Sequence, residues 1–558
     1  MNDILDMVFN EVLKEDFVEV IPSIPNRKTE KYAVCWRLVT EIEISQRSAE
    51  IELHIGFSDK FPYVLPDIYF LDKQYDYFPH IDYGNRKLCL FEEDAIIDAA
   101  APLQVLRSCV RQAKKLIKCV INKQNTYDFI EEIASYWLLS YDKETKLDVR
   151  YLVYGQLKNK CLLNIITNTM GVKMIVPDDS LNNVKGWFEQ YGAIEKVLFL
   201  PSLKVAPHPP YDIAYGGFWK LISEEDKKDV LHLLNRYSCM NILFPLSDNH
   251  LYGGFYSGYI DTNINGFRTG KVSQQTIIDT IYRNKKIPRI MANAYNNLRI
   301  ESRTSGARQT MFSFAIIGCG SIGSNLCTFL NSYNNVSLTL VDNDIFNVDN
   351  IGRHVLGITN VFQSKVYALK NRLLAAKPEM KIKAYNRNVY DINPQIVSGT
   401  DAVFLCTGNL SAESYFFKQM EENNIKRPIF VLWLEPYAIA GHLVYISAAD
   451  CFKEFRRCFD ERGRYKYNLI ESTEYDSKSS MLKKRDAGCN GAYTNYSGND
   501  VMLFLSSMYP HICDMIDNKT SSMCYRWVGN INAAKENGIA LTSKDARKNQ
   551  INVFPYQE

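Results

Sequence analysis

The stretch FSFAIIGCGSIGSNLCTFL, residues 312–330, decides the fold of the C-terminal half of this 558-residue chain. Phe314–Ile317 is a short apolar run typical of a buried strand, and Ser321–Leu330 is apolar at helical spacing. The turn between them carries three glycines in the pattern G-x-G-x-x-G, Gly318, Gly320 and Gly323. A strand, a glycine turn and a helix in this order let backbone N–H groups and a helix N-terminus approach a phosphate closely. The stretch therefore predicts nucleotide binding; the alternative is a turn that only packs a helix against a strand.

The polar residues that follow this turn have a spacing suited to a nucleoside triphosphate. The next strand, Val336–Val341, ends at Asp342, about twenty residues beyond the glycines, where an acid can hold a ribose. An acid, an amide and two cations come next, Asp344, Asn350, Arg353 and Lys365. An arginine and a lysine on a triphosphate offset the charge that builds as pyrophosphate leaves. A carboxylate can hold Mg²⁺ or the ribose.

These five residues, in this order and spacing, resemble the adenylating core of ubiquitin-activating enzymes and their ThiF-type bacterial relatives. The resemblance implies a Rossmann-like adenylation domain over residues 291–558 that binds ATP and Mg²⁺. It also implies a homodimer formed through that domain. In the family an Asp in a Cys-Thr-Asp-Asn run handles the metal, whereas this chain has Gly408 at that place, between Thr407 and Asn409. We therefore expect Asp344 or Asp401 to hold Mg²⁺.

Composition and charge restrict the class of protein. Hydrophobic residues make up 46% and charged residues 23% of the chain, and the net charge is +2. We therefore expect a multidomain α/β protein that binds neither nucleic acid by bulk electrostatics nor a membrane. The fourteen cysteines include no C-x-x-C pair, which argues against a zinc ribbon and a disulfide framework. The acidic amphipathic N-terminus is not a signal peptide, so we expect a cytoplasmic protein.

Residues 1–150 are predicted to form one domain of helices and alternating strands. The expected elements are a helix over about residues 2–15, strands at Tyr32–Val39 and Ala49–Gly56, and a helix at Pro102–Val120. Helix, meander, F-P…P, P-H…G…L-C-L and further helices resemble a ubiquitin-conjugating enzyme, an α+β fold. In that family the cysteine of the L-C-L segment, here Cys89, carries a thioester. The alternative is that Cys89 is a small buried apolar residue.

One position of this conjugating-like segment departs from the family. The family follows its His-Pro with an Asn that stabilises the oxyanion of aminolysis, whereas this chain reads Pro79-His80-Ile81-Asp82. Either His80, Asp82 or a backbone donor takes over this role, or transfer is slow. Asp94, five residues beyond Cys89, is a candidate to orient or deprotonate an incoming amine.

Residues 151–290 carry no catalytic motif, and we interpret them as an α+β spacer domain. A helix is predicted to open at the capping-box pattern that begins with Ser223. Four arginines lie on the approach to the glycine strand, Arg289, Arg299, Arg303 and Arg308. In the activating family an arginine of this lead-in can reach the partner subunit's ATP, but most of the four are expected to be ordinary solvated residues.

A second candidate thiol, Cys489, lies in the run DAGCNGAYTNYSGND. Flanking glycines let a bulky acyl adenylate approach a thiol, and a helix that starts near Asn499 could lower the pKa of that thiol. The run resembles the catalytic cysteine loop of bacterial activating enzymes fused to conjugating domains. Cys458, beside two arginines, is the nearest rival.

The order of the three domains resembles the fused enzyme of bacterial CBASS antiphage operons. The resemblance implies adenylation of the C-terminus of a cGAS-like nucleotidyltransferase, thioesters on Cys489 and then Cys89, and an amide bond to a lysine of a target protein. Two alternatives remain. One is a sulfur-carrier adenylating enzyme of the ThiF type, and the other is a scaffold without activity that binds the nucleotidyltransferase.

Overall fold

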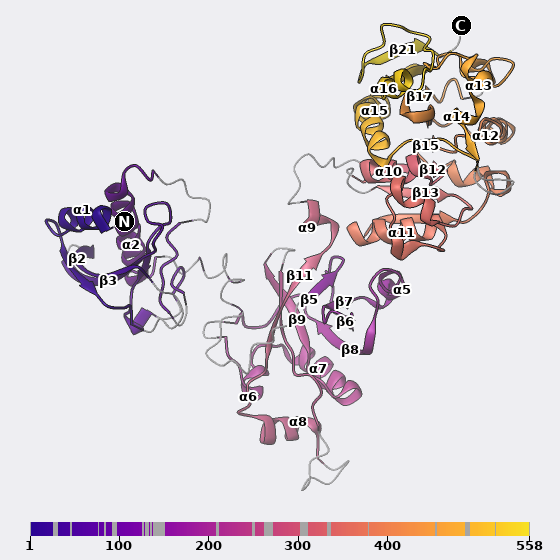
Figure 1. Ribbon diagram of the computed structural model, residues 1–558. Coiled ribbons are helices and arrows are strands. Elements are labelled where there is room, and N and C mark those ends of the chain that lie inside the picture. Colours follow the sequence, from indigo (N-terminus) through magenta and orange to yellow (C-terminus); the bar gives the residue numbers. More distant parts are fainter. Residues whose placement is uncertain are drawn as a thin grey trace. The chain divides into compact units, whose positions relative to one another are not determined.

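A computed structural model gives the fold of the chain (Figure 1). It describes residues 2–25, 32–44, 47–75, 78–82, 85–91, 98–124, 128, 133, 137, 151–207, 211–247, 251–261, 272–301, 311–331, 336–377, 379–451, 453, 455–485, 492–518 and 520–556. The chain divides into two compact units, residues 1–181 with 190–294, and residues 182–189 with 295–558. Among the described residues, no helix has both the length and the apolar character needed to cross a membrane.

The N-terminal segment forms an antiparallel four-stranded sheet in the order β1-β2-β3-β4. Its elements are α1 (Asn2–Val12), β1 (Phe17–Ile21), β2 (Val34–Ile44), β3 (Arg47–Phe57), β4 (Asp67–Tyr69), the 3₁₀ turn η1 (Lys73–Tyr75) and α2 (Pro102–Ile121). Helix α2 buries residues at helical spacing from Val105 to Val120 against this sheet, as its sequence predicts. The sheet and its helices are the α+β arrangement expected for this segment.

Residues 151–295 form a closed seven-stranded barrel in the order β10-β11-β5-β7-β6-β8-β9. The strands are β5 (Tyr151–Tyr154), β6 (Cys161–Thr167), β7 (Lys173–Val176), β8 (Tyr191–Phe199), β9 (Ile242–Ser247), β10 (Leu251–Phe255) and β11 (Arg289–Tyr295). The helical elements are η3 (Asp178–Ser180), α5 (Leu181–Lys185), α6 (Tyr215–Phe218), α7 (Glu224–Tyr237), α8 (Gln274–Ile277) and η4 (Ile278–Tyr282). The Ser223 hydroxyl accepts a hydrogen bond from the Asp226 N–H, so the predicted helix cap is confirmed.

The C-terminal unit is built on an eight-stranded sheet in the order β14-β13-β12-β15-β16-β17-β20-β21. Its strands are β12 (Ser313–Ile317), β13 (Ser337–Val341), β14 (Lys381–Tyr385), β15 (Ala402–Leu405), β16 (Ile429–Leu434), β17 (Ala440–Ile446), β20 (Met523–Val528) and β21 (Ile551–Pro555). The first five strands of the order are parallel and the rest antiparallel. Chain order reverses between β12 and β15, and ligands of open α/β sheets bind at such a switch point.

Helices and short turns complete this unit. They are α9 (Asn297–Glu301), α10 (Ser321–Leu330), η5 (Val348–Arg353), η6 (Ile358–Asn360), α11 (Lys365–Ala376), η7 (Val389–Asp391), η8 (Pro394–Val397), α12 (Leu410–Glu422), η9 (Pro436–Ala438), η10 (Phe455–Cys458), α13 (Glu474–Ser477), α14 (Ser479–Leu482), α15 (Gly498–Asn518) and α16 (Ile531–Glu536). A two-stranded ribbon, β18 (Lys484–Arg485) with β19 (Ala492–Tyr493), flanks the segment that contains Cys489.

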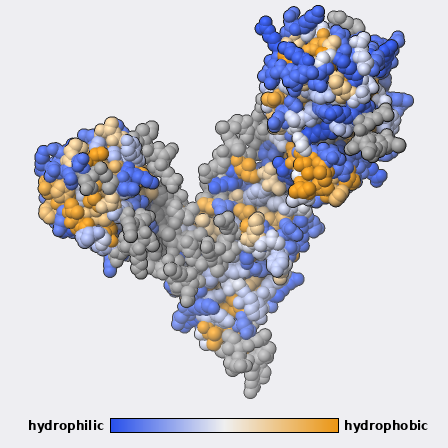
Figure 2. Space-filling view, in the orientation of Figure 1, coloured by the Kyte–Doolittle hydropathy of each residue, from blue (hydrophilic) through white to orange (hydrophobic). Residues whose placement is uncertain are grey.

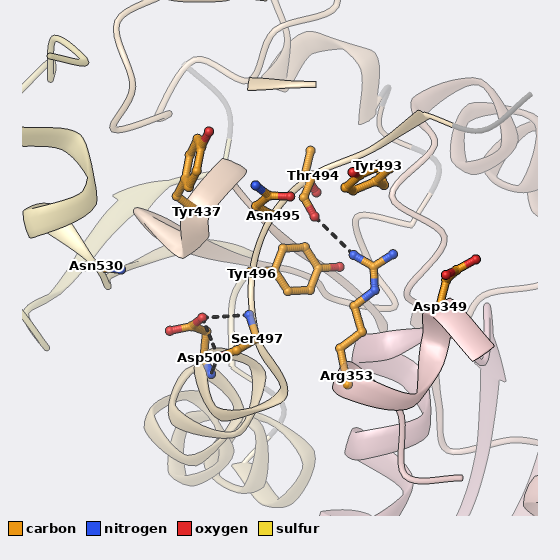
Figure 3. Close-up of a pocket in the computed structure, with 11 residues that line it drawn as sticks. Asp349, Arg353, Tyr437, Tyr493, Thr494, Asn495, Tyr496, Ser497, Asp500 and Asn530 are labelled. Atoms are coloured by element: carbon orange, nitrogen blue, oxygen red, sulfur yellow. Dashed lines mark hydrogen bonds between the residues drawn. The ribbon is translucent and has the colours of Figure 1, made fainter. Parts of the chain in front are cut away.

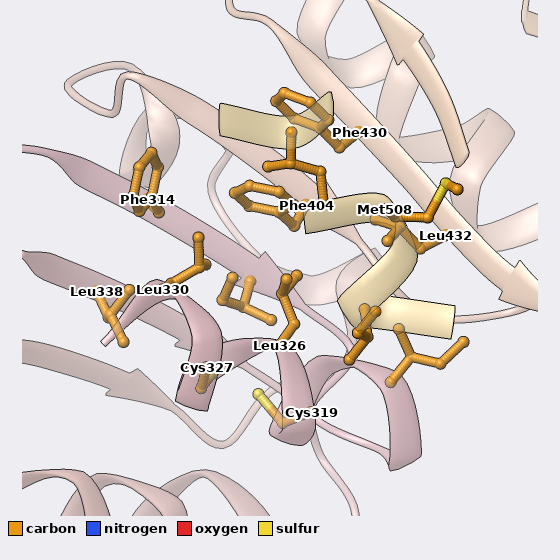
Figure 4. Close-up of a cluster of buried hydrophobic side chains, with 14 of the residues drawn as sticks. Phe314, Cys319, Leu326, Cys327, Leu330, Leu338, Phe404, Phe430, Leu432 and Met508 are labelled. Atoms are coloured by element: carbon orange, nitrogen blue, oxygen red, sulfur yellow. The ribbon is translucent and has the colours of Figure 1, made fainter. Parts of the chain in front are cut away.

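The main core of this unit lies between the sheet and helices α10, α11 and α15 (Figure 4). Phe314 of β12, Phe404 of β15 and Phe430 of β16 are neighbours across the sheet, and Leu326 of α10 and Met508 of α15 belong to the same cluster. Helix α10 spans the residues that the sequence predicts, and it can lie this close to β12 only because residue 323 is glycine. A Cβ there would lie 2.0 Å from the Gly318 carbonyl oxygen.

The surface of the C-terminal unit is mostly hydrophilic in Figure 2, with hydrophobic side chains gathered near α11. Residues on and just before α11 include five large apolar side chains that are exposed, Ile345, Val348, Ile358, Phe362 and Tyr367. Phe362 is 82% exposed and has a φ of 68°, a conformation that aromatic residues rarely adopt. We call these five residues the α11 apolar surface.

Replacing Gly323 by alanine tests the close packing of α10. Alanine normally stabilises a helix by up to about 1 kcal/mol relative to glycine. At this position we expect instead a loss of about 3 kcal/mol in the free energy of unfolding, because the new Cβ collides with backbone. Urea unfolding followed by intrinsic fluorescence measures the change.

The matched control is Gly320→Ala, since a Cβ at Gly320 meets nothing within 4 Å. We expect this variant to change the unfolding free energy by less than about 1 kcal/mol. Equal losses in the two variants would contradict the steric explanation.

Candidate active sites

A cleft of about 310 Å³ opens at the carboxyl ends of β12, β13 and β15. Fifteen residues line it, among them Gly318, Gly320, Asp342 and Asp344. These four were predicted from the sequence to touch a nucleotide. The topological switch point of the sheet thus coincides with the glycine turn, which is where a nucleotide is expected in this architecture.

The glycine turn leaves one side open for a ligand. Gly318 has a φ of +90°, and a Cβ there would touch the Cys406 backbone at 2.8 Å. Gly320, at the N-cap of α10, faces open space. The Asp342 carboxylate accepts hydrogen bonds from the N–H groups of Cys319, at 2.7 Å, and Asp344, at 2.8 Å. Asp342 therefore fixes the shape of the turn, while burial raises the pKa of its carboxyl group.

Lys365 and Asp344 form an ion pair beside this cleft, with 2.7 Å between Nζ and Oδ2. The Lys365 side chain is 8% exposed and that of Asp344 is 59% exposed. The Lys365 N–H also donates to the Asp344 carbonyl oxygen. The two residues predicted to handle phosphate charge and metal are therefore in contact, and the carboxylate remains accessible to solvent.

His354 holds the glycine turn through hydrogen bonds. This role cannot be recognised in the sequence. Its Nε2 lies 2.8 Å from the Cys319 carbonyl oxygen, and its Nδ1 accepts from the Leu356 N–H. The ring is therefore neutral, with the proton on Nε2. Burial lowers the pKa of His354 to about 4. The only signal in the sequence is its place directly after Arg353.

Two further residues near the cleft carry charge. Arg387, in the loop after β14, lines the cleft and can contribute a cation to a bound phosphate. It follows a parallel strand, so its place at the carboxyl edge of the sheet follows from the topology. Glu413, on α12, is buried beside the loop that lacks the expected Asp, and its Oε1 accepts from the Thr407 hydroxyl. Burial raises the pKa of Glu413.

A second, larger cavity of about 690 Å³ lies at the N-terminus of α15 (Figure 3). Arg353 reaches into it, donates from Nη1 to the Thr494 carbonyl oxygen at 3.1 Å, and stacks on the Tyr496 ring. The backbone carbonyl of Arg353 accepts from the Ser321 hydroxyl and from the amide of Asn325, both on α10. Arg353 therefore lines this cavity and is also bonded to the helix that follows the glycine turn.

The structure does not place all predicted ligands in the cleft. Asn350 uses its side-chain oxygen to accept from the Asn347 N–H and caps η5, so it shapes the turn that ends at Arg353. Asp401 accepts from the Ser313 N–H at 2.7 Å, at the amino end of β12, whereas Gly318 follows the opposite end of that strand. Asp401 is thus about 16 Å of strand away from the glycine turn and cannot share a metal with Asp344. The expectation for Asp401 is corrected accordingly.

The described residues contain no group of three or more His, Cys, Asp or Glu side chains arranged to hold a metal ion by themselves. Mg²⁺ usually keeps several waters and binds through one or two carboxylates together with substrate phosphates. An exposed carboxylate such as that of Asp344 fits this pattern.

Glu435 is buried and holds a more distant segment by hydrogen bonds. Its carboxylate contacts His442 Nε2 at 2.7 Å and accepts from the N–H groups of Leu469 and Ile470. Tyr437, two residues further on, lines the larger cavity.

Cys489 and Asp94 lie outside the described residues, so the structure does not place them. The described neighbours of Cys489 are informative, because the ribbon β18–β19 brackets its segment and Tyr493 and Thr494 line the larger cavity. The rival thiol Cys458 is buried, and its Sγ lies against the Tyr556 carbonyl oxygen. Burial raises the pKa of the Cys406 thiol.

Cys89 is exposed, and it is the one exposed thiol among the thirteen cysteines that the structure describes. Its N–H donates to the His80 carbonyl oxygen at 2.8 Å. The alternative in which Cys89 is a buried apolar residue is therefore wrong. Cys109, on α2 of the same domain, is buried, and burial raises its pKa to about 12.

His80, Asp82 and a backbone N–H are the candidates to replace the Asn that stabilises the oxyanion in the family. Their hydrogen bonds distinguish them. Asp82 accepts from the Asn85 side-chain amide at 2.6 Å and, as a carboxylate, has no proton to donate. The N–H of Cys89 is already used. His80 Nε2 lies 3.2 Å from the Asp128 carboxylate, and His80 has a φ of 62°. Of these groups, the His80 ring is the one that carries a side-chain N–H.

Among the lead-in arginines, Arg289 is excluded from reaching another subunit's nucleotide. It is buried in the barrel, pairs with Asp212 at 3.0 Å, and lies over the rings of Trp137 and Tyr211. Its charge is therefore used within its own unit. Arg303 and Arg308 lie outside the described residues.

Comparisons with known families agree with both halves of this description. The model of the ThiF family matches residues 303–473, and that of prokaryotic E2 family B matches residues 36–145. The chain therefore joins a prokaryotic E2 domain to a ThiF domain, the bacterial counterparts of ubiquitin-conjugating and ubiquitin-activating enzymes.

Individual relatives are distant. A probable molybdopterin-synthase adenylyltransferase of Porphyra purpurea is 28% identical over 102 residues, which are 18% of this chain and 27% of that protein. The chain thus spans about a quarter of this curated relative. Among solved structures, PaaA has a TM-score of 0.32 at 16% identity, over 44% of this chain and 73% of its own. Escherichia coli MccB with ATP has a TM-score of 0.29 at 12% identity, over 44% of this chain and 64% of its own.

His354 predicts a dependence of stability on pH. Its pKa is about 4 in the folded protein and near 6.5 when unfolded. Below about pH 6.5 the unfolded chain therefore binds a proton that the folded chain does not, and stability falls as the pH falls toward 4. We expect His354→Gln, which keeps a donor for the Cys319 carbonyl, to remove on the order of 2–3 kcal/mol of this loss. Urea unfolding at pH 7.5 and pH 4.5 measures it. An unchanged pH dependence in the variant would contradict this account.

The exposure of Cys89 predicts selective chemistry. Brief treatment of the native protein with iodoacetamide at pH 8 should label Cys89 far ahead of Cys109, whose thiolate is scarce because its pKa is about 12. Peptide mass mapping identifies the labelled residues. The Cys89→Ser variant should lose the corresponding mass, and labelling of Cys109 at a comparable rate would contradict the structure.

Proposed function

We propose that this chain activates the C-terminus of a protein with ATP and transfers it, through two thioesters, to a lysine of a target protein. The tail carboxylate attacks the α-phosphate, pyrophosphate leaves, and an acyl adenylate forms. The Cys489 thiolate then attacks the acyl carbon and expels AMP. The Cys89 thiolate takes the acyl group from Cys489, and a target amine displaces Cys89 to give an amide, losing one proton.

The observation that carries this proposal is the exposed thiol of Cys89 in the conjugating-like domain, on the same chain as a nucleotide cleft of ThiF type. A scaffold without activity would not need this thiol in solvent. A sulfur-carrier adenylating enzyme would need no conjugating domain. Having both activities on one chain raises the effective concentration of one thiol for the other.

In the cleft, Gly320 gives room for phosphate oxygens and Arg387 supplies positive charge, and Lys365 beside the cleft supplies more. Asp344 is the carboxylate proposed to hold Mg²⁺ together with the phosphates of the bound ATP. The metal, when bound, would neutralise charge on the leaving pyrophosphate. Lys365 keeps Asp344 oriented while the cleft is empty of ligand charge, and it can turn to a phosphate when ATP binds.

The larger cavity beside Arg353 is proposed to receive the substrate tail. Its volume of about 690 Å³ suits several residues of small side chain, and tyrosines and amides supply hydrogen bonds to an extended backbone. The protein that bears the tail is proposed to be a cGAS-like nucleotidyltransferase of a CBASS antiphage operon in the bacterial cytoplasm. This last step rests on the resemblance of the domain order alone.

A homodimer is proposed to form over the α11 apolar surface. If each of the five side chains has on the order of 200 Å² of surface, their exposed parts sum to roughly 600 Å². This area is close to that of one side of a standard protein–protein interface. Water contact at so large an apolar area is unfavourable for a monomer.

Trapped thioesters test the relay. The protein is purified from cells that hold its natural operon, incubated with ATP and Mg²⁺, quenched in acid, and analysed by intact mass with and without a thiol reductant. We expect an adduct that reductant removes. It should be absent in Cys489→Ala and retained on Cys489 in Cys89→Ala. Cys119→Ala, which changes a half-buried cysteine of the conjugating-like domain, is the matched control and should behave as the wild type.

An absence of adduct in every form, with ATP binding still measurable, would overturn the relay and support the scaffold. An adduct on Cys489 that never reaches Cys89, even with both thiols present, would support the sulfur-carrier alternative.

A further inference from the structure

A groove of about 500 Å³ lies on the conjugating-like domain where β3 runs on beyond the end of β4. Strand β4 pairs only with His54, Ile55 and Gly56 of β3, so the part of β3 from Arg47 to Leu53 has no strand on that side among the described residues. Phe70, Tyr75 and Ile121 supply apolar contacts from the other walls.

The register shows which backbone groups face this groove. The Leu88 N–H donates to the Ile68 carbonyl oxygen and the Phe70 N–H to that of Arg86, so the even-numbered residues of β4 bond away from β3. The odd-numbered residues of β4 therefore bond to His54 and Gly56, which turns the even-numbered residues of β3 toward β4 and its odd-numbered residues toward β2. The N–H and C=O groups of the even-numbered residues Ser48, Glu50 and Glu52 therefore point toward the groove. None of these groups bonds to described backbone on that side. An uncovered edge of this kind readily pairs with another extended segment.

Three acids, Glu50, Glu52 and Asp72, line the groove together with His54. Arg37 already pairs with Glu52 at 2.7 Å, so Glu50 and Asp72 are the acids left to meet a further cation. His54 is only 6% exposed, and its Nδ1 has no hydrogen-bond partner among the described residues. Nε2 contacts the Glu52 carboxylate at 2.7 Å, so Nδ1 is the ring nitrogen left without a partner. A buried polar atom without a partner is costly unless a ligand satisfies it.

We propose that an extended, lysine- or arginine-bearing segment of a partner protein binds in this groove by adding a strand to the free edge of β3. Its backbone pairs with Ser48, Glu50 and Glu52, and its basic side chains meet the carboxylates. The strand alternation sends every second side chain of the segment to the same face, so the segment should carry cations at alternate positions. This site does not involve Cys89, so the proposal does not depend on the proposed thioester relay.

The test uses the full-length protein and a fluorescein-labelled peptide, Lys-Val-Lys-Val-Lys-Val-Lys, with binding followed by anisotropy. Two further peptides separate the components of binding: one with glutamates in place of the lysines, and one with N-methyl groups on alternate amides. We expect saturable binding of the lysine peptide and at least tenfold weaker binding of both others, since one lacks the charge and the other the strand-pairing donors.

Two protein variants make the site specific. Glu50→Lys should weaken binding of the lysine peptide at least tenfold, because Glu50 is exposed in the groove and has no side-chain partner among the described residues. Asp59→Lys makes the same charge change in the turn after β3, at the far end of that strand, and should alter the dissociation constant less than twofold.

Three results would overturn the proposal. No saturation by the lysine peptide would show that the edge is not a binding site. Equal effects of Glu50→Lys and Asp59→Lys would show that binding is only general electrostatic attraction. Equal binding of the N-methylated peptide would show that no strand is added.

Discussion

The contact between Gly323 and the carbonyl oxygen of Gly318 is the constraint on which the nucleotide cleft depends. The turn is so tight that a side chain on residue 323 has no room. Helix α10 therefore begins directly over the end of β12, with its first N–H groups at the switch point of the sheet. The same edge brings Asp342 from the neighbouring strand to the turn. The site is thus a consequence of strand order and one missing Cβ.

Hydrogen bonds from buried polar side chains hold the segments that do not pair as strands. His354 reaches back to the glycine turn, so the segment that carries Asp344 and Arg353 cannot move independently of it. Glu435 does the same for a more distant segment, because its carboxylate accepts two N–H groups at Leu469 and Ile470. Unpaired, a buried carboxylate would be very unfavourable. These hydrogen bonds explain why an acid can stay in the core.

The sequence predicts those parts of the molecule that depend on neighbours along the chain. The helix Ser321–Leu330, the cap at Ser223 and the proximity of Lys365 to the acid motif all follow from spacing of a few residues or from one motif. The closure of residues 151–295 into a barrel does not, because strands β5 and β7 pair in parallel across intervening chain. Asp344 follows β13 and Asp401 precedes β15, and they lie at opposite edges because both strands run parallel to β12, a relation that the sequence alone does not show.

In the conjugating-like site, the hydrogen bonds that are already formed limit which groups can replace the Asn that stabilises the oxyanion. The N–H of Cys89 is committed to the His80 carbonyl, and Asp82 is an acceptor. The His80 ring carries a side-chain N–H, and its Nε2 lies 3.2 Å from the Asp128 carboxylate. Among the groups considered as substitutes for the usual Asn, these bonds therefore favour His80.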